Sequence, residues 1–568
     1  MRVTPARLFR AALAISLTLS ALLFFLWSWR WPLLGDASLI HYIGFLIQRG
    51  WVPYRDLGDM NMPGSFLIEI AAMHLYGTGE LAWRLFDFTL LAIASASFFV
   101  ITAGRASSVG GPSAELGGPS FAVSSQRVGS APPQQSEHNW LAALFSASLF
   151  ILIHGRDGLA EGGQRDLTMA VLLLAATAFL FLAVRKGSSW SAAAFGLLSG
   201  VALTIKPTAL PLSLLQLALA LYVLRRQTSN VASRFASPAI LAGLIGPAVA
   251  LLFLLREHAL AAFLAGFHGI IPYYASLGHR PLSFVVLHSI SPLLPIVIAW
   301  LVVLALQRKV FNWSDNWERN TLLIGVLFGL LNCIAQQRAL PYYRYPLLVF
   351  LLPLIAIDFT TATAQGGPSF AVSSQRVGSG RAASALAILA LAFGAFVLAP
   401  QSAILIHRYR WREIDFISSL QQNLTTLGGP ALSGHIQCID SISGCGNVLY
   451  RMRLEPATGV LSDFLLFGAV SDQQPPDEIP ILRDTRAQFA SDLLAHPPQV
   501  IVVTSHLHID GPDNFEKLAP LARLRQLSRR PLHPPDAMVT NPYRPLVEPR
   551  RNLRKLPYLR PPPAFGCP

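Results

Sequence analysis

Long hydrophobic stretches recur from residue 11 to residue 404, and short polar stretches separate them. A helix needs about 20 mostly apolar residues to cross a bilayer. The pattern therefore predicts about eleven transmembrane helices. The predicted spans are residues 11–30, 81–103, 139–154, 167–185, 190–205, 207–224, 236–255, 284–306, 320–335, 345–362 and 382–405.

Loop charge decides between eleven spans and ten. Residues 190–205 and 207–224 could form one kinked segment around Lys206-Pro207, because proline removes a backbone donor. Cytoplasmic loops carry an excess of arginine and lysine. With a cytoplasmic N-terminus and eleven spans, the arginine-rich loops fall inside and most acids near the membrane fall outside. We therefore expect eleven spans, with the C-terminal region outside the cytoplasm.

The first hydrophobic stretch could instead be a cleaved signal peptide. Trp27, Trp29 and Trp31 stand where the small residues of a cleavage site are expected. Tryptophan is enriched at membrane interfaces. We therefore expect an uncleaved first helix.

The loop that follows this helix, about residues 35–80, is too long for a simple connection. Ile40, Ile43, Leu46 and Ile47 recur at helical spacing, which predicts a short helix lying on the membrane. Pro63-Gly64 opens a second short apolar segment that ends near Gly77. It is too short to span comfortably, so we expect a second interfacial helix.

The hydrophobic pattern changes after residue 405. Residues 499–510 read as a buried strand followed by a polar loop, residues 447–454 as another strand, and residues 481–495 as an amphipathic helix. These elements predict a small C-terminal α/β domain. The expected organisation is a transmembrane domain over residues 1–405, an extracytoplasmic domain over 406–542 and a Pro/Arg-rich tail over 543–568.

Composition agrees with a membrane protein. Of the 568 residues, 53% are hydrophobic and only 13% are charged, against about 25% charged in a typical soluble domain. The formal net charge is +14, but the basic residues are scattered between apolar stretches and in the tail. This distribution does not fit a nucleic-acid-binding surface. The expected fold class is predominantly α, a polytopic helical membrane protein in the cell membrane.

Two local features remain. The sequence GGPSFAVSSQRVGS occurs at residues 117–130 and again at 366–379, both in expected cytoplasmic loops. We interpret the copies as tolerated insertions in flexible loops. Cys438 and Cys445 could form a disulfide in an oxidising compartment, and no cysteine or histidine spacing indicates zinc.

Several motifs on one side of the expected membrane resemble the GT-C superfamily of membrane glycosyltransferases, which includes protein O-mannosyltransferases and the lipid A aminoarabinose transferase. The first outer loop opens with Asp36, reaches Tyr54-Arg55-Asp56, and continues into Pro63-Gly64. The other matching segments are GRDGLAEGGQRDLTMAVLLLAA at 155–176, GLLSGVALTIKPTAL at 196–210 and QQRALPYYRYPLL at 336–348.

The resemblance implies an inverting sugar transfer, in which an acceptor hydroxyl attacks a lipid-linked sugar and polyprenyl phosphate leaves. Such a reaction needs a carboxylate base and cations near the phosphate. The candidate catalytic residues are Asp36 and Asp166, and the candidate substrate-binding residues are Arg84, Arg165, Lys206, Arg338, Tyr342, Tyr343, Arg344, Asp56, Asp59, Asp157 and Glu161. The implied partners are a polyprenyl-phosphate sugar donor, a lipid, glycan or protein acceptor, and the membrane, without nucleic acid.

One departure from the family concerns metal binding. Several relatives have Asp-Glu where this chain has Asp36-Ala37. A second carboxylate role or a metal ligand at this position is therefore not implied. A divalent metal ion stays open as a cofactor.

Several candidate residues could instead have a purely structural role. Asp36 and Asp166 each precede or begin a helix, so either could serve as a cap or a partner of the helix dipole. Lys206 could extend its amine to the interface, and Arg338 and Arg344 could anchor an aromatic belt. At the level of the whole chain, the alternatives are a transporter or lipid flippase and a non-catalytic envelope assembly protein.

Overall fold

We analysed a computed structural model of the chain. The residues that the structure describes are 14–15, 18–19, 21–26, 28–103, 133–158, 161–227, 229–277, 280–290, 293–306, 316–338, 340–364, 417–439, 444–462, 464–468, 478–503 and 539–540. Both copies of the repeat and the expected last span, 382–405, lie outside these residues.

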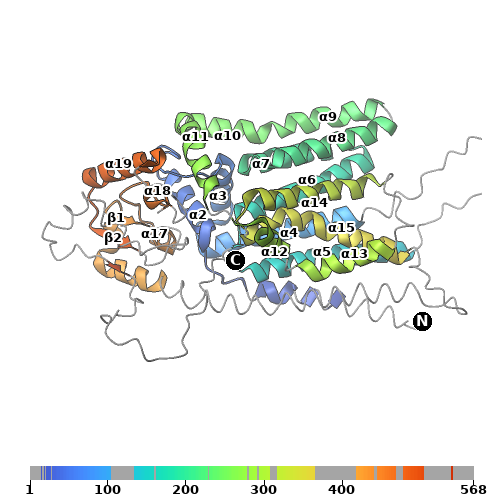
Figure 1. Ribbon diagram of the computed structural model, residues 1–568, viewed down its shortest axis with the longest axis horizontal. Coiled ribbons are helices and arrows are strands. Elements are labelled where there is room, and N and C mark those ends of the chain that lie inside the picture. The colour runs from blue at the N-terminus through green and yellow to red at the C-terminus, as the bar shows by residue number, and fades with distance from the viewer. Residues whose placement is uncertain are drawn as a thin grey trace, which may run out of the picture.

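Helices form most of the described structure, and the longer ones lie side by side in a bundle (Figure 1). The bundle helices are α4 (Glu80–Ala103), α5 (Pro133–Asp157), α6 (Arg165–Lys186), α7 (Ser189–Ile205), α8 (Ala209–Gln227), α9 (Ser229–Gly243), α10 (Ile245–Arg256), α13 (Leu294–Leu306), α14 (Trp317–Gln336) and α15 (Tyr345–Ala364). The other helices of this part of the chain are α2 (Gly35–Gln48), α3 (Pro63–Tyr76), α11 (Leu260–Ser276) and α12 (Leu282–Ile290). A 3₁₀ turn, η4 (Pro341–Arg344), leads into α15.

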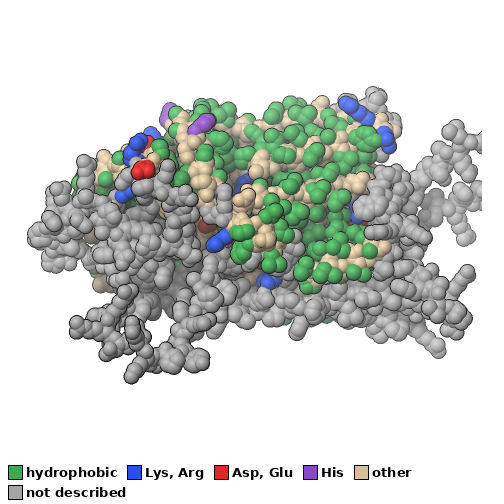
Figure 2. Space-filling view, viewed as in Figure 1, with side chains coloured by type: hydrophobic (Ala, Val, Ile, Leu, Met, Phe, Trp, Pro, Cys, Tyr) green, Lys and Arg blue, Asp and Glu red, His purple; other side chains and the backbone are tan. Residues whose placement is uncertain are grey.

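Five helical segments among the described residues are long and apolar enough to cross a membrane. They are Glu80–Thr102, Arg165–Lys186, Ala209–Arg226, Arg234–Arg256 and Trp317–Gln336. Hydrophobic side chains cover most of the described flank of the bundle in Figure 2. A surface of this kind suits hydrocarbon and would be costly in water. The chain is therefore a multi-pass membrane protein.

The segment around Lys206-Pro207 forms two helices rather than one kinked helix. Helix α7 ends at Ile205, Lys206 has an extended backbone, and α8 begins at Ala209. Proline cannot donate the backbone hydrogen bond that would continue α7. The break places Lys206 directly after the last residue of α7, outside both helices.

Glycines allow α7 to lie very close to α9 and α10. A Cβ atom at Gly196 would collide with the carbonyl oxygen of Ala239, and one at Gly200 would collide with that of Gly243. Small residues at such contacts are typical of helix pairs in membranes, where backbones must approach for packing to favour association.

The first loop contains the two short helices that the sequence predicted, α2 and α3. The structure corrects the expectation that α2 lies on the membrane surface, since Ala37 to Ile47 are all buried within the protein. Helix α2 packs against α3 and against the C-terminal helix α17 (Gly446–Met452). Its apolar residues therefore face protein on both sides rather than lipid on one.

The C-terminal region packs at one end of the bundle (Figure 1). It contains a parallel sheet in the order β1-β2-β3, made of Ile436–Cys438, Val500–Val503 and Val539–Thr540. The short helix α18 (Phe464–Phe467) and the amphipathic helix α19 (Pro480–Ala495) accompany it.

Three sequence predictions for this region have different outcomes. The strand at 499–503 and the helix at 481–495 are confirmed, but the strand predicted at 447–454 is wrong, because Gly446–Met452 is helix α17. The apolar residues of α17 contact both α2 and the hydrophobic core. They therefore lie on more than one face of the helix and give no amphipathic pattern in the sequence. Cys438 and Cys445 are joined in a disulfide, which fixes the start of α17 beside β1.

Helix α17 and the residues after it hold the first loop in place. Asn447 Nδ2 donates to the carbonyl oxygen of Leu33, and Tyr42 Oη donates to that of Leu454 at 2.9 Å. Trp51 Nε1 donates to Glu455 Oε2 at 3.0 Å. These bonds are buried or partly buried, where an unpaired polar group would be costly. The C-terminal region thereby orients the loop that carries Asp36.

Candidate functional site

Most of the candidate residues lie at the end of the bundle where α2, α6, α7 and η4 meet. We call Asp36, Asp157, Glu161, Arg165, Asp166, Lys206, Tyr342, Tyr343 and Arg344 the acid–cation cluster. Asp36 is half-buried in the first turn of α2. Tyr342 Oη donates to Asp36 Oδ2 at 3.0 Å, although the two residues are 306 positions apart.

The second half of the cluster is built around Asp166, which begins α6 and is fully buried. Lys206 Nζ lies 2.5 Å from Asp166 Oδ1 and donates to Gln336 Oε1 at 3.1 Å. Arg165 Nε lies 3.8 Å from Asp166 Oδ2. Two cations therefore share one carboxylate, and part of their positive charge stays available for a further anion.

Aromatic rings connect the two halves. Lys206 Nζ lies 5.0 Å from the centroid of the Tyr343 ring, and the rings of Tyr343 and Tyr342 meet edge-on at 4.6 Å. A contiguous path of side chains thus runs from Asp36 through both tyrosines to Lys206 and Asp166. Burial raises the pKa of both Tyr342 and Tyr343 above the usual tyrosine value. Each phenol therefore keeps its proton, and Tyr342 uses its proton to donate to Asp36.

The loop between α5 and α6 adds two further acids. Arg344 Nη2 donates to Asp157 Oδ1 at 2.8 Å, and both side chains are almost fully buried. Glu161 is 6% exposed, and its Oε2 atom makes no hydrogen bond within the described part of the chain. Burial raises the pKa of Glu161 well above its usual value, and the negative charge of Asp157 raises it further. The negative charges of Asp36 and Asp166 also raise the pKa of Glu161.

Replacing Glu161 with glutamine should flatten the dependence of stability on pH. Between the usual glutamate pKa of about 4.3 and the raised value, the folded protein holds a proton that the unfolded chain releases. Wild-type stability should therefore fall as pH rises through this window, and Glu161→Gln should remove that loss. Melting temperatures measured from pH 4 to pH 8 in lipid nanodiscs would show the effect.

Asp56→Asn is a matched control with the opposite sign. The Arg55 side chain lowers the pKa of Asp56, so this carboxylate stabilises the fold above its usual pKa and the stabilisation is lost as pH falls. An unchanged pH profile in Glu161→Gln would contradict the expected protonation of Glu161.

The remaining candidates lie around the cluster or apart from it. Arg338 donates to the backbone carbonyls of Tyr274 and Leu277, and its guanidinium stacks 3.7 Å from the centroid of the Tyr274 ring. Asp59 is buried, accepts from the backbone N–H of Asn61 at 2.5 Å, and has a pKa that burial raises. Asp56 pairs with Arg55 at 2.7 Å near the surface.

Arg84 belongs to a separate buried group that the sequence reasoning did not resolve. It forms an ion pair with Asp87, three positions later, and donates to Ser28 Oγ at 2.7 Å. Asp87 also accepts from the backbone N–H of Gly163 at 2.8 Å and lies 3.3 Å from His154 Nε2. This group supports the loop that carries Glu161, so it acts on the cluster through the backbone.

The sequence reasoning also missed a pair in the first loop. His41 of α2 is 1% exposed, and its Nδ1 atom lies 2.7 Å from Glu69 Oε2. The four-residue spacing of Ser65 and Glu69 on α3 placed both on one face, but nothing in the sequence linked that face to His41.

The described residues contain no group of three or more His, Cys, Asp or Glu side chains that could hold a metal ion. In the acid–cation cluster, Asp157 and Asp166 are already paired with cations.

No model of a known protein family matches the chain, and no curated protein matches it. Among solved structures, it is similar to ArnT from Cupriavidus metallidurans bound to undecaprenyl phosphate. The sequence identity is 14%, the match covers 80% of this chain and 91% of that chain, and the TM-score is 0.52. The same ArnT in the apo state matches over the same shares, at 14% identity and a TM-score of 0.48. The first of these matches shows that the chain shares the overall fold of ArnT.

Proposed function

We propose that the protein is an inverting glycosyltransferase that moves a sugar from a polyprenyl-phosphate donor to an acceptor on the outer face of the membrane. The observation that carries the proposal is the acid–cation cluster, in which one half-buried acid and a set of cations share one end of a GT-C-like bundle. The similar ArnT structure holds undecaprenyl phosphate, which supports a lipid-linked donor.

The geometry supports a division of roles within the cluster. Asp36 accepts the Tyr342 hydroxyl, and no described cation forms an ion pair with it. It is suited to take a proton from an acceptor hydroxyl. Lys206 and Arg165 share the single charge of Asp166. They are suited to hold the phosphate, where negative charge increases as the sugar leaves.

We also propose the membrane topology that the loop charges predict. The chain would cross the cell membrane about eleven times, with a cytoplasmic N-terminus. Residues 406–542 would form an extracytoplasmic domain and residues 543–568 a tail. The disulfide between Cys438 and Cys445 supports an oxidising compartment for this region, because such bonds rarely persist in the cytosol.

Purified protein in lipid vesicles, assayed with a panel of undecaprenyl-phosphate sugars, tests this function. We expect transfer of one sugar, with release of undecaprenyl phosphate. Failure to bind or use any of these donors, together with coupled movement of a solute across the vesicle, would support the transporter instead. Binding without transfer by any donor would support a non-catalytic role.

Replacing Lys206 with methionine should weaken donor binding about 10–100-fold, the effect of losing one hydrogen bond to a charged group. Methionine keeps the length of the side chain and removes its charge. Equilibrium binding of a radiolabelled donor to protein in nanodiscs measures the effect. Lys186→Met, an exposed lysine at the other end of α6, is the control. Equal binding by both variants would remove Lys206 from the phosphate site.

A further inference from the structure

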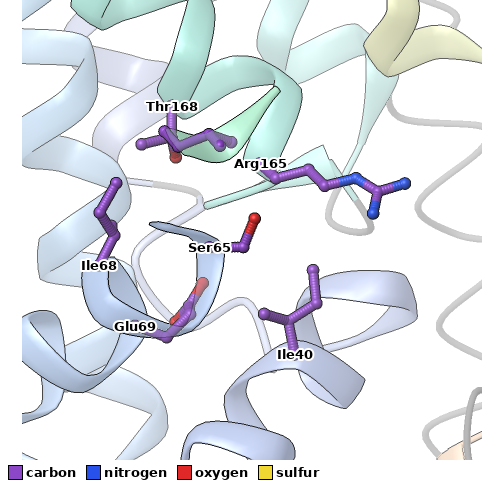
Figure 3. A pocket seen from close by; sticks show the side chains of 7 residues that line it. Ile40, Ser65, Ile68, Glu69, Arg165 and Thr168 are labelled. Atoms are coloured by element: carbon purple, nitrogen blue, oxygen red, sulfur yellow. The ribbon is translucent and has the colours of Figure 1, made fainter. Parts of the chain in front are cut away.

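A small pocket lies between α2, α3, α6 and α7, next to the acid–cation cluster. Its polar lining includes Ser65, Glu69 and Arg165. Its apolar lining comes from the isoleucines Ile40, Ile68 and Ile205. In Figure 3, the Ser65 hydroxyl and the Glu69 carboxylate point from α3 into the space between α2 and α6.

The pocket is continuous with the cluster through its lining residues. Ile40 lies four positions after Asp36 in α2, so the two share a helix face. Arg165 directly precedes Asp166, and Ile205 directly precedes Lys206. The pocket therefore adjoins the cluster at Arg165, which belongs to both.

Two polar atoms of the pocket make no hydrogen bond among the described residues. Ser65 is 4% exposed, and its Oγ atom makes no hydrogen bond to any described residue. Arg165 Nε is buried and likewise makes no hydrogen bond among the described side chains. A buried hydroxyl without a partner costs free energy unless a ligand or water completes it. Thr168, which also lines the pocket, already donates to the Gln164 carbonyl oxygen at 3.1 Å.

The size and lining of the pocket limit its occupant to one small polar group. It has room for about one water-sized group. A phosphate is too large, and the Glu69 carboxylate would repel it. A single hydroxyl fits better, because Ser65 Oγ has no hydrogen bond of its own and Glu69, whose Oε2 is bonded to His41, keeps a second carboxylate oxygen, while the isoleucines can contact the carbon that carries the hydroxyl.

We propose that this pocket receives the exocyclic hydroxymethyl group of a hexose donor, and that Ser65 selects hexoses over pentoses and 6-deoxyhexoses. The inference rests on the proposed transfer reaction and adds the class of sugar. A site that hydrogen-bonds a substrate hydroxyl disfavours the analogue that lacks it, because the buried polar group is then left unpaired.

The test compares three undecaprenyl-phosphate donors that carry a hexose, the matching 6-deoxyhexose and the matching pentose. Wild-type protein should transfer the hexose with the highest kcat/KM. Ser65→Ala should lower kcat/KM about tenfold for the hexose and leave the 6-deoxyhexose unchanged, as expected for the loss of one buried hydrogen bond. Ser65→Val should fill the pocket and shift the preference toward the pentose.

Ser97→Ala is the matched control, because Ser97 is also buried and donates to the carbonyl oxygen of Ile93 in its own helix. It should leave all three rates unchanged. A wild-type preference for the pentose or the 6-deoxyhexose, or an equal loss on all donors in Ser65→Ala, would overturn the pocket assignment and leave the transfer reaction standing. Absence of transfer from every donor would overturn both.

Discussion

Replacing Asp36 with asparagine should lower the turnover of sugar transfer by about 10²–10⁴, the usual contribution of a general base. Asparagine keeps the size of the side chain and can still accept the Tyr342 hydroxyl, which lies 3.0 Å from Asp36 Oδ2. The change therefore removes basicity with little change in shape. Turnover at saturating donor and acceptor measures the effect, and donor binding should stay near the wild-type value because Lys206 and Arg165 remain.

Asp56→Asn provides the comparison within the same loop. Asp56 pairs with Arg55 near the surface and caps the backbone N–H of Val52 at 2.8 Å, so its loss should change turnover little. Near-normal transfer by Asp36→Asn would refute Asp36 as the base. A loss of donor binding in the same variant would instead indicate that Asp36 orients the donor.

Replacing Asp87 with alanine should destabilise the protein by about 3–5 kcal/mol, the usual cost of leaving one partner of a buried ion pair without the other. Both side chains of the Arg84–Asp87 pair are fully buried. The same change removes the acceptor of the Gly163 backbone N–H. Unfolding in lipid nanodiscs, followed by denaturant titration, measures the loss.

The double variant Arg84→Met with Asp87→Ala separates charge from packing. Removing both charges should recover part of the lost stability, since no buried arginine is then left unpaired. Asp484→Ala, in an exposed pair with Arg483, is the control and should change stability by less than about 1 kcal/mol. A small loss in Asp87→Ala would mean that water reaches Arg84.

Hydrophobic periodicity located helices well because lipid imposes a strong and simple requirement. The segment predicted at 167–185 is α6, Arg165–Lys186, and the segment predicted at 345–362 is α15, Tyr345–Ala364. The same reasoning failed at 447–454. Helix α17 there is only 7 residues long and is buried on more than one side, so neither its length nor its pattern distinguished it from a strand.

The residues of the candidate site were likewise only partly predictable from the sequence. Acids at helix starts and a lysine before proline could be selected from local sequence, and the structure brings Asp166 and Lys206 together across 40 positions. The partners that complete the arrangement could not be selected. Tyr342 reaches Asp36 across 306 positions and His154 reaches Tyr345 across 191. Such pairs depend on how the helices pack, which periodicity along one segment does not encode.

The contacts of α17 and Leu454 with the first loop determine when the site can form during translation. The bonds from Asn447 to Leu33 and from Tyr42 to Leu454 span 414 and 412 positions. A ribosome must therefore make most of the chain before the segment bearing Asp36 can reach its final place. Until then, even a nascent chain that contains every residue of the acid–cation cluster lacks these contacts with the first loop. The packing around Asp36 is therefore completed only after Leu454 has been made.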